Sequence, residues 1–224
     1  MSLPNQPQTK RVGVLISGFG SNLQALIDAC NHDYINAEIA VVVSNKARVT
    51  GLARAAEAGI DTAVISAKDY PERSDYDRAL ASLLDDYSVD LVVLAGFMRI
   101  LTADFVNAYS GRMLNIHPSL LPKYPGLNTH QRALDNGDTQ SGCSIHFVTA
   151  ELDGGPIILQ TKVPIFADDD AQLIAQRVNS QELTSYPLVV KWFCDDRLVM
   201  RDNKAWLDNQ PLGPCGYAND DADE

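Results

Sequence analysis

The sequence predicts a Rossmann-like α/β fold, with a doubly wound, mostly parallel sheet and antiparallel strands toward the C-terminus. Short apolar runs alternate with helix-like segments from residue 11 to about residue 110, which is the pattern of repeated βαβ units. Beyond residue 140, two segments of alternating apolar and polar residues flank the glycine pair at 154 and 155. Such segments are typical of antiparallel strands, so the predicted sheet is mixed.

The first βαβ unit follows directly from the N-terminal pattern. The run RVGVLIS at 11–17 is apolar without alternation, as in a strand that is buried on both faces. A glycine-rich turn follows, and we expect Ser21 or Asn22 to cap a helix that continues to about Asn31. The apolar run EIAVVVS at 38–44 then supplies a second strand and completes the unit.

The later elements are predicted from the same signals. Helices are expected at roughly 50–58, 72–86 and 102–109, and strands at 62–65, 90–96, 112–116, 143–149 and 156–165. A further helix opens near Asp168 to Asp170, and we expect Pro187 to interrupt or end it, because proline lacks the amide hydrogen that a helix uses. The segment 197–207 is typical of a hairpin that turns at Asp202 and Asn203.

Length and composition indicate one globular domain over residues 11–208. A chain of 224 residues, 46% hydrophobic and 21% charged, is long enough to bury one sizeable core. Residues 1–10 are expected to form an N-terminal extension, and they lack the apolar segment of a signal peptide. Residues 209–224 end in NDDADE after a stretch rich in proline and glycine, so we expect an acidic, poorly ordered tail.

Charge and cysteine usage narrow the classes of function. No segment approaches the roughly 18 uninterrupted apolar residues of a membrane helix, so we expect a cytoplasmic protein without a membrane partner. The net charge of −11 disfavours nucleic acid as a partner and favours small-molecule substrates, while the oligomeric state stays open. The four cysteines, Cys30, Cys143, Cys194 and Cys215, have no C-x-x-C spacing, which argues against a zinc knuckle, redox pair or disulfide scaffold.

The turn SGFGSN at 17–22 stands between a strand and the start of a helix. Backbone N–H groups and the helix dipole favour an anion at such a place, so the functional interpretation is a phosphate site. A dinucleotide fingerprint would have a third glycine where the chain has Leu23, which weakens the case for a nicotinamide dehydrogenase. On this motif alone, a structural role in which Gly18 and Gly20 permit a tight turn is equally favoured.

The strongest local signal is NIHPSLLP at 115–122. The two-residue period of a strand puts Asn115 and His117 on one face. At the carboxyl end of a sheet strand, an amide beside an imidazole can stabilise an oxyanion and move a proton, and acyl transfer needs both. For an isolated Asn-x-His pair, the favoured alternative is two hydrogen-bonded residues that anchor a proline-rich loop.

Asp153 is the candidate partner of His117, because it enters the Gly-Gly-Pro turn of ELDGGP at 151–156. A carboxylate held there could relay protons, whereas the plain alternative is an aspartate that caps a turn. His130 and His146 have no acidic neighbour at metal-ligand spacing, so both are expected to be structural and no metal is expected. Cys143 has no evident base and is not expected to be a nucleophile.

Four motifs together carry a resemblance to a known family. They are SGFGSN at 17–22, AGFMRIL at 95–101, NIHPSLLPKYPG at 115–126 and ELDGGP at 151–156. In this order and spacing they closely resemble the phosphoribosylglycinamide formyltransferase family, and the likeness covers nearly the whole chain. The resemblance implies a folate-dependent enzyme of purine biosynthesis. Its co-substrate would be 10-formyltetrahydrofolate, and the amine of glycinamide ribonucleotide would take the formyl group by direct attack.

The resemblance also implies roles for individual residues. Asn115 would hold the formyl oxygen, His117 would act as general acid or electrostatic stabiliser, and Asp153 would assist His117 and relay protons. The ribonucleotide would bind to Gly20, Ser21, Asn22, Asn179, Ser180, Gln181 and Glu182. The folate would bind to Arg73, Met98, Arg99, Ile100, Leu101, Asn115, Thr149, Ala150, Glu151, Leu152 and Asp153. For Met98, Ile100 and Leu101 the alternative is ordinary core.

Three residues depart from the family pattern. Phe19 stands where a polar or basic residue is usual, Asn128 stands within a loop that commonly has GLHTH, and Leu183 stands where a histidine often follows the glutamate. Phe19 and Leu183 flank the expected ribonucleotide pocket and so bear on its affinity. Alternatives of the same fold are formyltetrahydrofolate hydrolase, a non-catalytic folate sensor and methionyl-tRNA formyltransferase. The length of the chain disfavours the hydrolase and the tRNA enzyme, and its acidity argues further against the tRNA enzyme.

Overall fold

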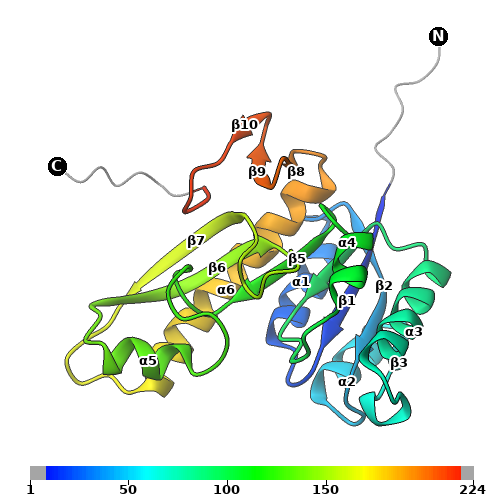
Figure 1. The fold of residues 1–224 in the computed structure, drawn as a ribbon, viewed down its shortest axis with the longest axis horizontal. Coiled ribbons are helices and arrows are strands. Elements are labelled where there is room, and N and C mark those ends of the chain that lie inside the picture. Colours follow the sequence, from blue (N-terminus) through cyan, green and yellow to red (C-terminus); the bar gives the residue numbers. More distant parts are fainter. Residues whose placement is uncertain (1–8, 218–224) are drawn as a thin grey trace.

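Within residues 9–217, the part of the chain that the computed structural model describes, the predicted mixed sheet is present with seven strands. They are β1 (Lys10–Ile16), β2 (Ala37–Ser44), β3 (Thr62–Val64), β4 (Leu91–Leu94), β5 (Met113–His117), β6 (Gln140–Phe147) and β7 (Ile157–Pro164). Their order is β3-β2-β1-β4-β5-β6-β7 (Figure 1). Neighbours from β3 to β5 pair in parallel, whereas β6 is antiparallel to both β5 and β7.

Helices cover both faces of this sheet, as a doubly wound fold requires. They are α1 (Ser21–Asn31), α2 (Thr50–Glu57), α3 (Arg73–Asp86), α4 (Ala103–Ala108), α5 (Thr129–Asp135) and α6 (Ala171–Cys194), with a short 3₁₀ helix, η1 (Ala67–Asp69). Val14 and Ile16 of β1 belong to the buried cluster that includes α1 and α6, whereas Leu15 belongs to the one that includes α3 and α4. The two-residue period of the strand thus explains why β1 is apolar throughout.

Helix α6 differs from the prediction, because it continues through Pro187 to Cys194. Pro187 is buried, as are Val189, Val190 and Trp192 beyond it, and the last three belong to the core cluster on this face of the sheet. Their burial offsets the backbone hydrogen bond that proline cannot donate. The expectation that Pro187 interrupts or ends the helix is therefore wrong.

The start of α1 also differs from the prediction. Gly20 is the N-cap residue and has a left-handed conformation, with φ of 79°, and no side chain caps the helix. Glycine adopts this conformation without steric cost, so Ser21 is already the first helical residue. The side chain of Asn22 points to another element, and the expectation that Ser21 or Asn22 caps α1 is wrong.

The predicted C-terminal hairpin is present as β8 (Leu198–Arg201) and β9 (Lys204–Leu207). Its turn residues, Asp202 and Asn203, both have positive φ, at 50° and 55°, which is the geometry of a two-residue turn that matches strand twist. A third strand, β10 (Gln210–Pro211), pairs with β9. Figure 1 shows this small sheet at the top of the view, apart from the main sheet.

Residues 209–217 are more ordered than expected. They include β10, and the Tyr217 amide donates to the Ile158 carbonyl of β7 at 2.7 Å. Because these backbone groups have partners on β9 and β7, the expectation of a poorly ordered tail is wrong for this range. Residues 1–8 of the predicted extension and 218–224 of the predicted tail lie outside the described residues. Over residues 9–217, no helix combines the length and apolar character needed to cross a membrane.

Candidate functional site

The candidate site lies where the order of the strands reverses. Strands β1 and β4 are neighbours in the middle of the sheet, and the chain proceeds outward from them in opposite directions. This arrangement opens a crevice beyond their carboxyl ends, where open α/β sheets bind ligands. The buried Ser17 hydroxyl, directly after β1, accepts the Met98 amide at 2.7 Å and donates to Asn45 Oδ1 at 2.6 Å. Ser17 therefore joins the turn after β1 to the segment after β4.

The turn after β1 presents the start of α1 to this crevice. The amides in the first turn of a helix have no acceptor within the helix, so they are free to bind an anion. A Cβ on Gly20 would lie 2.8 Å from Gly51 Cα, and the Gly51 amide donates to the Gly18 carbonyl at 3.1 Å. The start of α2 thus packs directly against the turn. The sequence analysis missed Gly51, whose only signal was a glycine at the start of a helix.

Helix α6 contributes polar side chains beside this turn. The Asn22 amide donates to Glu182 Oε2 at 3.0 Å, and the Asn179 amide lies 3.1 Å from the same oxygen and 3.4 Å from Ser21 Oγ. Asn22 and Glu182 are each 8% exposed. Asn22 Oδ1 is buried without a hydrogen-bond partner among the described residues. The structure therefore brings together four of the expected ribonucleotide residues around a buried carboxylate.

Ser180 and Gln181 do not join this group in the structure. Both are exposed, and the Ser180 hydroxyl donates to the Gln176 carbonyl within α6 at 3.0 Å. Successive residues of a helix differ in direction by about 100°, so these two lie off the face that carries Asn179 and Glu182. Their role in binding stays a prediction.

Asn115 faces a histidine across the sheet. The register of β5 and β6 pairs Asn115 with His146, and Asn115 Nδ2 lies 3.1 Å from His146 Nε2. His146 Nδ1 lies 2.9 Å from the Phe147 carbonyl, to which it can only donate. Burial lowers the pKa of His146, so the ring is neutral and Nε2 accepts a hydrogen from Asn115. His146 therefore holds the Asn115 amide in one orientation.

His117 and Asp153 are brought together from β5 and the loop after β6. His117 Nδ1 lies 3.5 Å from Asp153 Oδ2, and the two side chains are 7% and 9% exposed. Asp153 Oδ2 also accepts the Gly126 amide at 2.9 Å, and His117 Nε2 donates to the Tyr124 carbonyl at 2.9 Å. The proline-rich loop after β5 is thus tied to both members of the pair.

His146 is the member of this cluster whose role the sequence analysis missed. Its Nε2 atom lies 4.0 Å from Asp153 Oδ1, so the ring stands close to both Asn115 and Asp153. The available signal was the alternation in CSIHFVT, which puts Ser144 and His146 on one face of a strand. The sequence could not show that this face lies opposite Asn115, because the register is set by the pairing of β5 with β6.

Three further candidate groups come from the sequence: His130, Cys143 and a metal site. His130 is on α5, where burial lowers its pKa. Burial raises the pKa of the Cys143 thiol to about 11, so a thiolate nucleophile is not favoured there. Within the described part of the chain, no group of three or more His, Cys, Asp or Glu side chains is arranged to hold a metal ion.

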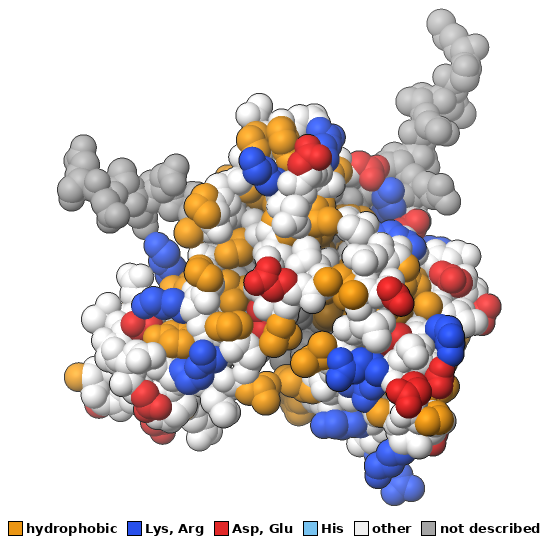
Figure 2. Space-filling view, in the orientation of Figure 1, with side chains coloured by type: hydrophobic (Ala, Val, Ile, Leu, Met, Phe, Trp, Pro, Cys, Tyr) orange, Lys and Arg blue, Asp and Glu red, His pale blue; other side chains and the backbone are white. Residues whose placement is uncertain are grey.

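Exposed apolar side chains lie on the segments expected to bind folate. Met98 and Ile100 are 62% and 57% exposed, so the interpretation of these two as ordinary core is wrong, whereas Leu101 packs against the cluster of α3 and α4. Leu152, one residue before Asp153, is 55% exposed. Figure 2 shows hydrophobic side chains around a hollow in the middle of the face in view. Such a lining is expected of a cleft that binds a flat ring system.

Other expected folate residues differ in how close they lie to this cluster. Thr149, Ala150 and Glu151 are on the same loop as Asp153, which follows β6. Arg99 lies with its guanidinium 4.0 Å from the centroid of the Tyr76 ring. Arg73 is exposed at the first position of α3, and no hydrogen bond or ion pair among residues 9–217 links it to the cluster.

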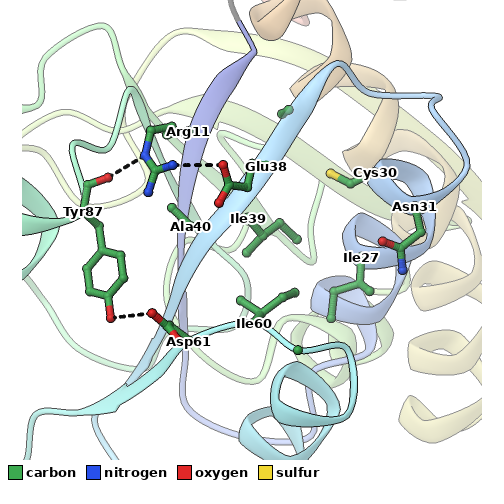
Figure 3. A pocket seen from close by; sticks show the side chains of 12 residues that line it. Arg11, Ile27, Cys30, Asn31, Glu38, Ile39, Ala40, Ile60, Asp61 and Tyr87 are labelled. Atoms are coloured by element: carbon green, nitrogen blue, oxygen red, sulfur yellow. Dashed lines mark hydrogen bonds and ion pairs between the residues drawn. The ribbon is translucent and has the colours of Figure 1, made fainter.

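A second hollow lies at the opposite, amino end of the strands (Figure 3). It has a volume of about 420 Å³ and is lined by the end of α1, by residues that begin β1 and β2, and by residues that precede β3 and β4. Four of its residues pair with one another. Arg11 donates to Glu38 at 2.9 Å and to the Tyr87 carbonyl at 2.8 Å, and the Tyr87 hydroxyl donates to Asp61 at 3.1 Å. None of the expected site residues lines it.

Comparisons with known proteins show the family to which the chain belongs. The sequence profile of the formyl transferase family matches residues 10–190. The chain is 59% identical over 208 residues to the phosphoribosylglycinamide formyltransferase of Escherichia coli K12, covering 93% of this chain and 98% of that one. It is 51% identical to the enzyme of the same name from Haemophilus influenzae, over 94% of this chain and 100% of that one.

A solved structure shows the same architecture. The phosphoribosylglycinamide formyltransferase of Coxiella burnetii superposes with a TM-score of 0.90 at 46% identity, over 93% of this chain and 98% of that one. The chain therefore belongs to the formyl transferase family.

Proposed function

We propose that this protein transfers the formyl group of 10-formyltetrahydrofolate to the amine of glycinamide ribonucleotide, giving formylglycinamide ribonucleotide and tetrahydrofolate in purine biosynthesis. The observation that carries the proposal is the convergence of Asn115, His117 and Asp153 beside the central crevice. The similarity to enzymes named for this reaction supports it. Both substrates are small molecules, the folate is consumed as a co-substrate, and the proposed chemistry needs no metal. We place the reaction in the cytoplasm.

The proposed reaction is a direct attack of the substrate amine on the formyl carbon. The formyl oxygen becomes an oxyanion, which Asn115 and protonated His117 stabilise. When the carbonyl re-forms, the bond between the formyl carbon and folate N10 breaks, and N10 takes up a proton so that tetrahydrofolate leaves. The Asn115 amide has two hydrogens, and one of them is held by His146. The second is therefore available to the formyl oxygen, and a fixed amide loses little entropy when it binds the transition state.

The proton chemistry falls to His117 and Asp153. Protonated imidazole has two N–H groups, and in the structure the two nitrogens face the Tyr124 carbonyl and Asp153. One of these contacts must give way for His117 to reach the substrate. The 3.5 Å separation from Asp153 is longer than a charge-assisted hydrogen bond, so we expect Nδ1 to be the nitrogen that serves the substrate. Asp153 would then accept the proton that the amine releases, directly or through water.

The neighbouring polar group suits the ribonucleotide. Glu182 is buried and receives two amide donors, and Asn22 Oδ1 has no partner among the described residues. Buried acceptors of this kind gain most from a ligand that brings hydrogen-bond donors. The amine and ribose hydroxyls of the ribonucleotide are such donors, while its phosphate suits the amides at the start of α1.

The first test follows tetrahydrofolate release by absorbance from 10-formyltetrahydrofolate, with and without glycinamide ribonucleotide. We expect release that depends on the ribonucleotide. Release without it would identify a hydrolase instead. Folate binding without release under either condition would identify a sensor, and both of these outcomes contradict the proposal.

A further inference from the structure

The turn at 17–22 has a cationic neighbour that the family motifs do not include. Arg54 of α2 donates from Nε to the Phe19 carbonyl at 3.1 Å and from Nη1 to Gln24 Oε1 at 3.2 Å. Its guanidinium carbon lies 4.5 Å from the centroid of the Phe19 ring. Its Cδ atom lies 3.7 Å from the position of a Cβ on Gly20. Arg54 is therefore held along the first turn of α1.

These contacts fix the guanidinium but leave part of it available. Among residues 9–217, Nη2 makes no hydrogen bond, whereas Nε and Nη1 each make one. The partners of Arg54 are uncharged, and it forms no ion pair with a described acidic residue. A guanidinium that keeps its full charge and a free N–H is suited to a phosphate, which it can bind by charge-assisted hydrogen bonds.

A cationic group beside the phosphate site offsets the overall negative charge of the protein. The chain carries a net charge of −11, and the long-range field of an acidic protein repels an anionic ligand. Local positive charge must compensate for this repulsion. Figure 2 shows Lys and Arg side chains gathered on the side of the hollow where α2 lies. Phe19 stands where a polar or basic residue is usual. Its ring lies against the Arg54 guanidinium and helps to hold it in place.

We propose that Arg54 binds the phosphate of the ribonucleotide together with the amides of α1, and that Phe19 orients the Arg54 guanidinium. This inference rests on the proposed function, because it assigns a further specificity residue to the same substrate. Arg54 acts on the phosphate and not at the formyl group, so its loss should raise the KM for the ribonucleotide while sparing kcat and the KM for the folate.

The test compares Arg54→Met and Arg54→Lys, with Arg78→Met as a control that removes the same charge from an exposed position on α3. Arg54→Met should raise the KM for the ribonucleotide about 10- to 30-fold, as expected for loss of a charged hydrogen bond. Arg54→Lys should recover most of this loss, and Arg78→Met should show none. Phe19→Leu should raise the same KM about 2- to 4-fold, because a cation–π contact is worth less than a charged hydrogen bond.

A substrate without phosphate separates binding from support of the turn. With glycinamide riboside, the kcat/KM of Arg54→Met should equal that of the wild type. An equal loss with riboside and ribonucleotide, or no loss with either, would overturn the inference. If the wild-type protein shows no ribonucleotide-dependent turnover, the proposed function fails, and calorimetric titration with ribose 5-phosphate then tests Arg54 by itself. Binding that weakens in Arg54→Met supports the phosphate site, and equal or absent binding overturns it.

Discussion

The two ends of the sheet each carry a hollow, and the hollows differ in what their polar groups do. At the amino end, Arg11, Glu38, Tyr87 and Asp61 pair with one another around a pocket of about 420 Å³ (Figure 3). At the carboxyl end, buried polar groups remain unpaired, such as Asn22 Oδ1. Leaving a buried acceptor unpaired costs free energy unless a ligand or water completes it. Unpaired buried polar groups therefore distinguish the carboxyl-end hollow from the amino-end hollow, whose polar groups already have partners.

The largest effect that this comparison predicts is on turnover. His117→Ala should lower kcat by about 10² to 10⁴, because it removes the general acid and one stabiliser of the oxyanion. Tyr87→Phe at the amino end should leave kcat unchanged, since it removes only the hydrogen bond to Asp61. Initial rates of tetrahydrofolate release would measure both. Wild-type turnover in His117→Ala, or a comparable loss in Tyr87→Phe, would contradict the assignment of the catalytic site to the carboxyl end.

Two glycines give a matched test of the backbone at the two ends. Gly20 and Gly59 both have positive φ, at 79° and 74°, and Gly59 lines the amino-end pocket. A Cβ added at Gly20 would lie 2.8 Å from Gly51 Cα, whereas a Cβ added at Gly59 would have no neighbour within 4 Å. We expect Gly59→Ala to lower the free energy of unfolding by about 1 to 2 kcal/mol from backbone strain. Gly20→Ala should cost about 1 to 3 kcal/mol more, because of overpacking.

Urea unfolding would measure these two differences, and the KM for the ribonucleotide would report on the turn. Only Gly20→Ala should raise that KM, because only Gly20 lies at the start of α1. Equal destabilisation by the two variants would show that the contact with Gly51 does not constrain the turn.

The smallest effect concerns pH and the ion pair between Asp169 and Arg177 at the start of α6. Arg177 donates to both carboxylate oxygens of Asp169, just before α6, and holds the pKa of Asp169 at about 2, below the ordinary value of 3.8. A carboxyl group with a lowered pKa in the folded state contributes stability above its unfolded pKa and loses it as the pH falls. Asp169→Asn should therefore be less stable than the wild type at neutral pH.

Thermal unfolding between pH 7 and pH 2 would test this expectation. The difference in melting temperature between Asp169→Asn and the wild type should shrink from about pH 4 downward and be nearly gone at pH 2. Gly59→Ala serves as the control, because its effect does not involve a titrating group. A difference that stays constant with pH would show that the ion pair adds nothing.

Prediction from sequence succeeded for most local patterns, although the cap of α1 was wrong, and it failed where packing decides. The apolar run of β1, the turn at Asp202 and Asn203, and the antiparallel strands β6 and β7 were all predicted and are present. Pro187 was expected to interrupt or end α6, yet the helix continues to Cys194 because the residues beyond Pro187 pack in the core. His146 was expected to be merely structural, because nothing in its own segment shows that it lies opposite Asn115.

The sequence by itself therefore determined the alternation of strands and helices, the glycine-rich turn after β1, and the placement of Asn115 and His117 on one face of a strand. Each of these depends on the period of one strand or on the geometry of a few consecutive residues. Only the tertiary structure decided which distant residues are in contact. Glu182 contacts Asn22, which is 160 positions away in the sequence; Asp153 lies beside His117, and Arg54 contacts Phe19. Such contacts depend on strand order, register and helix packing, which arise from the burial of the whole core.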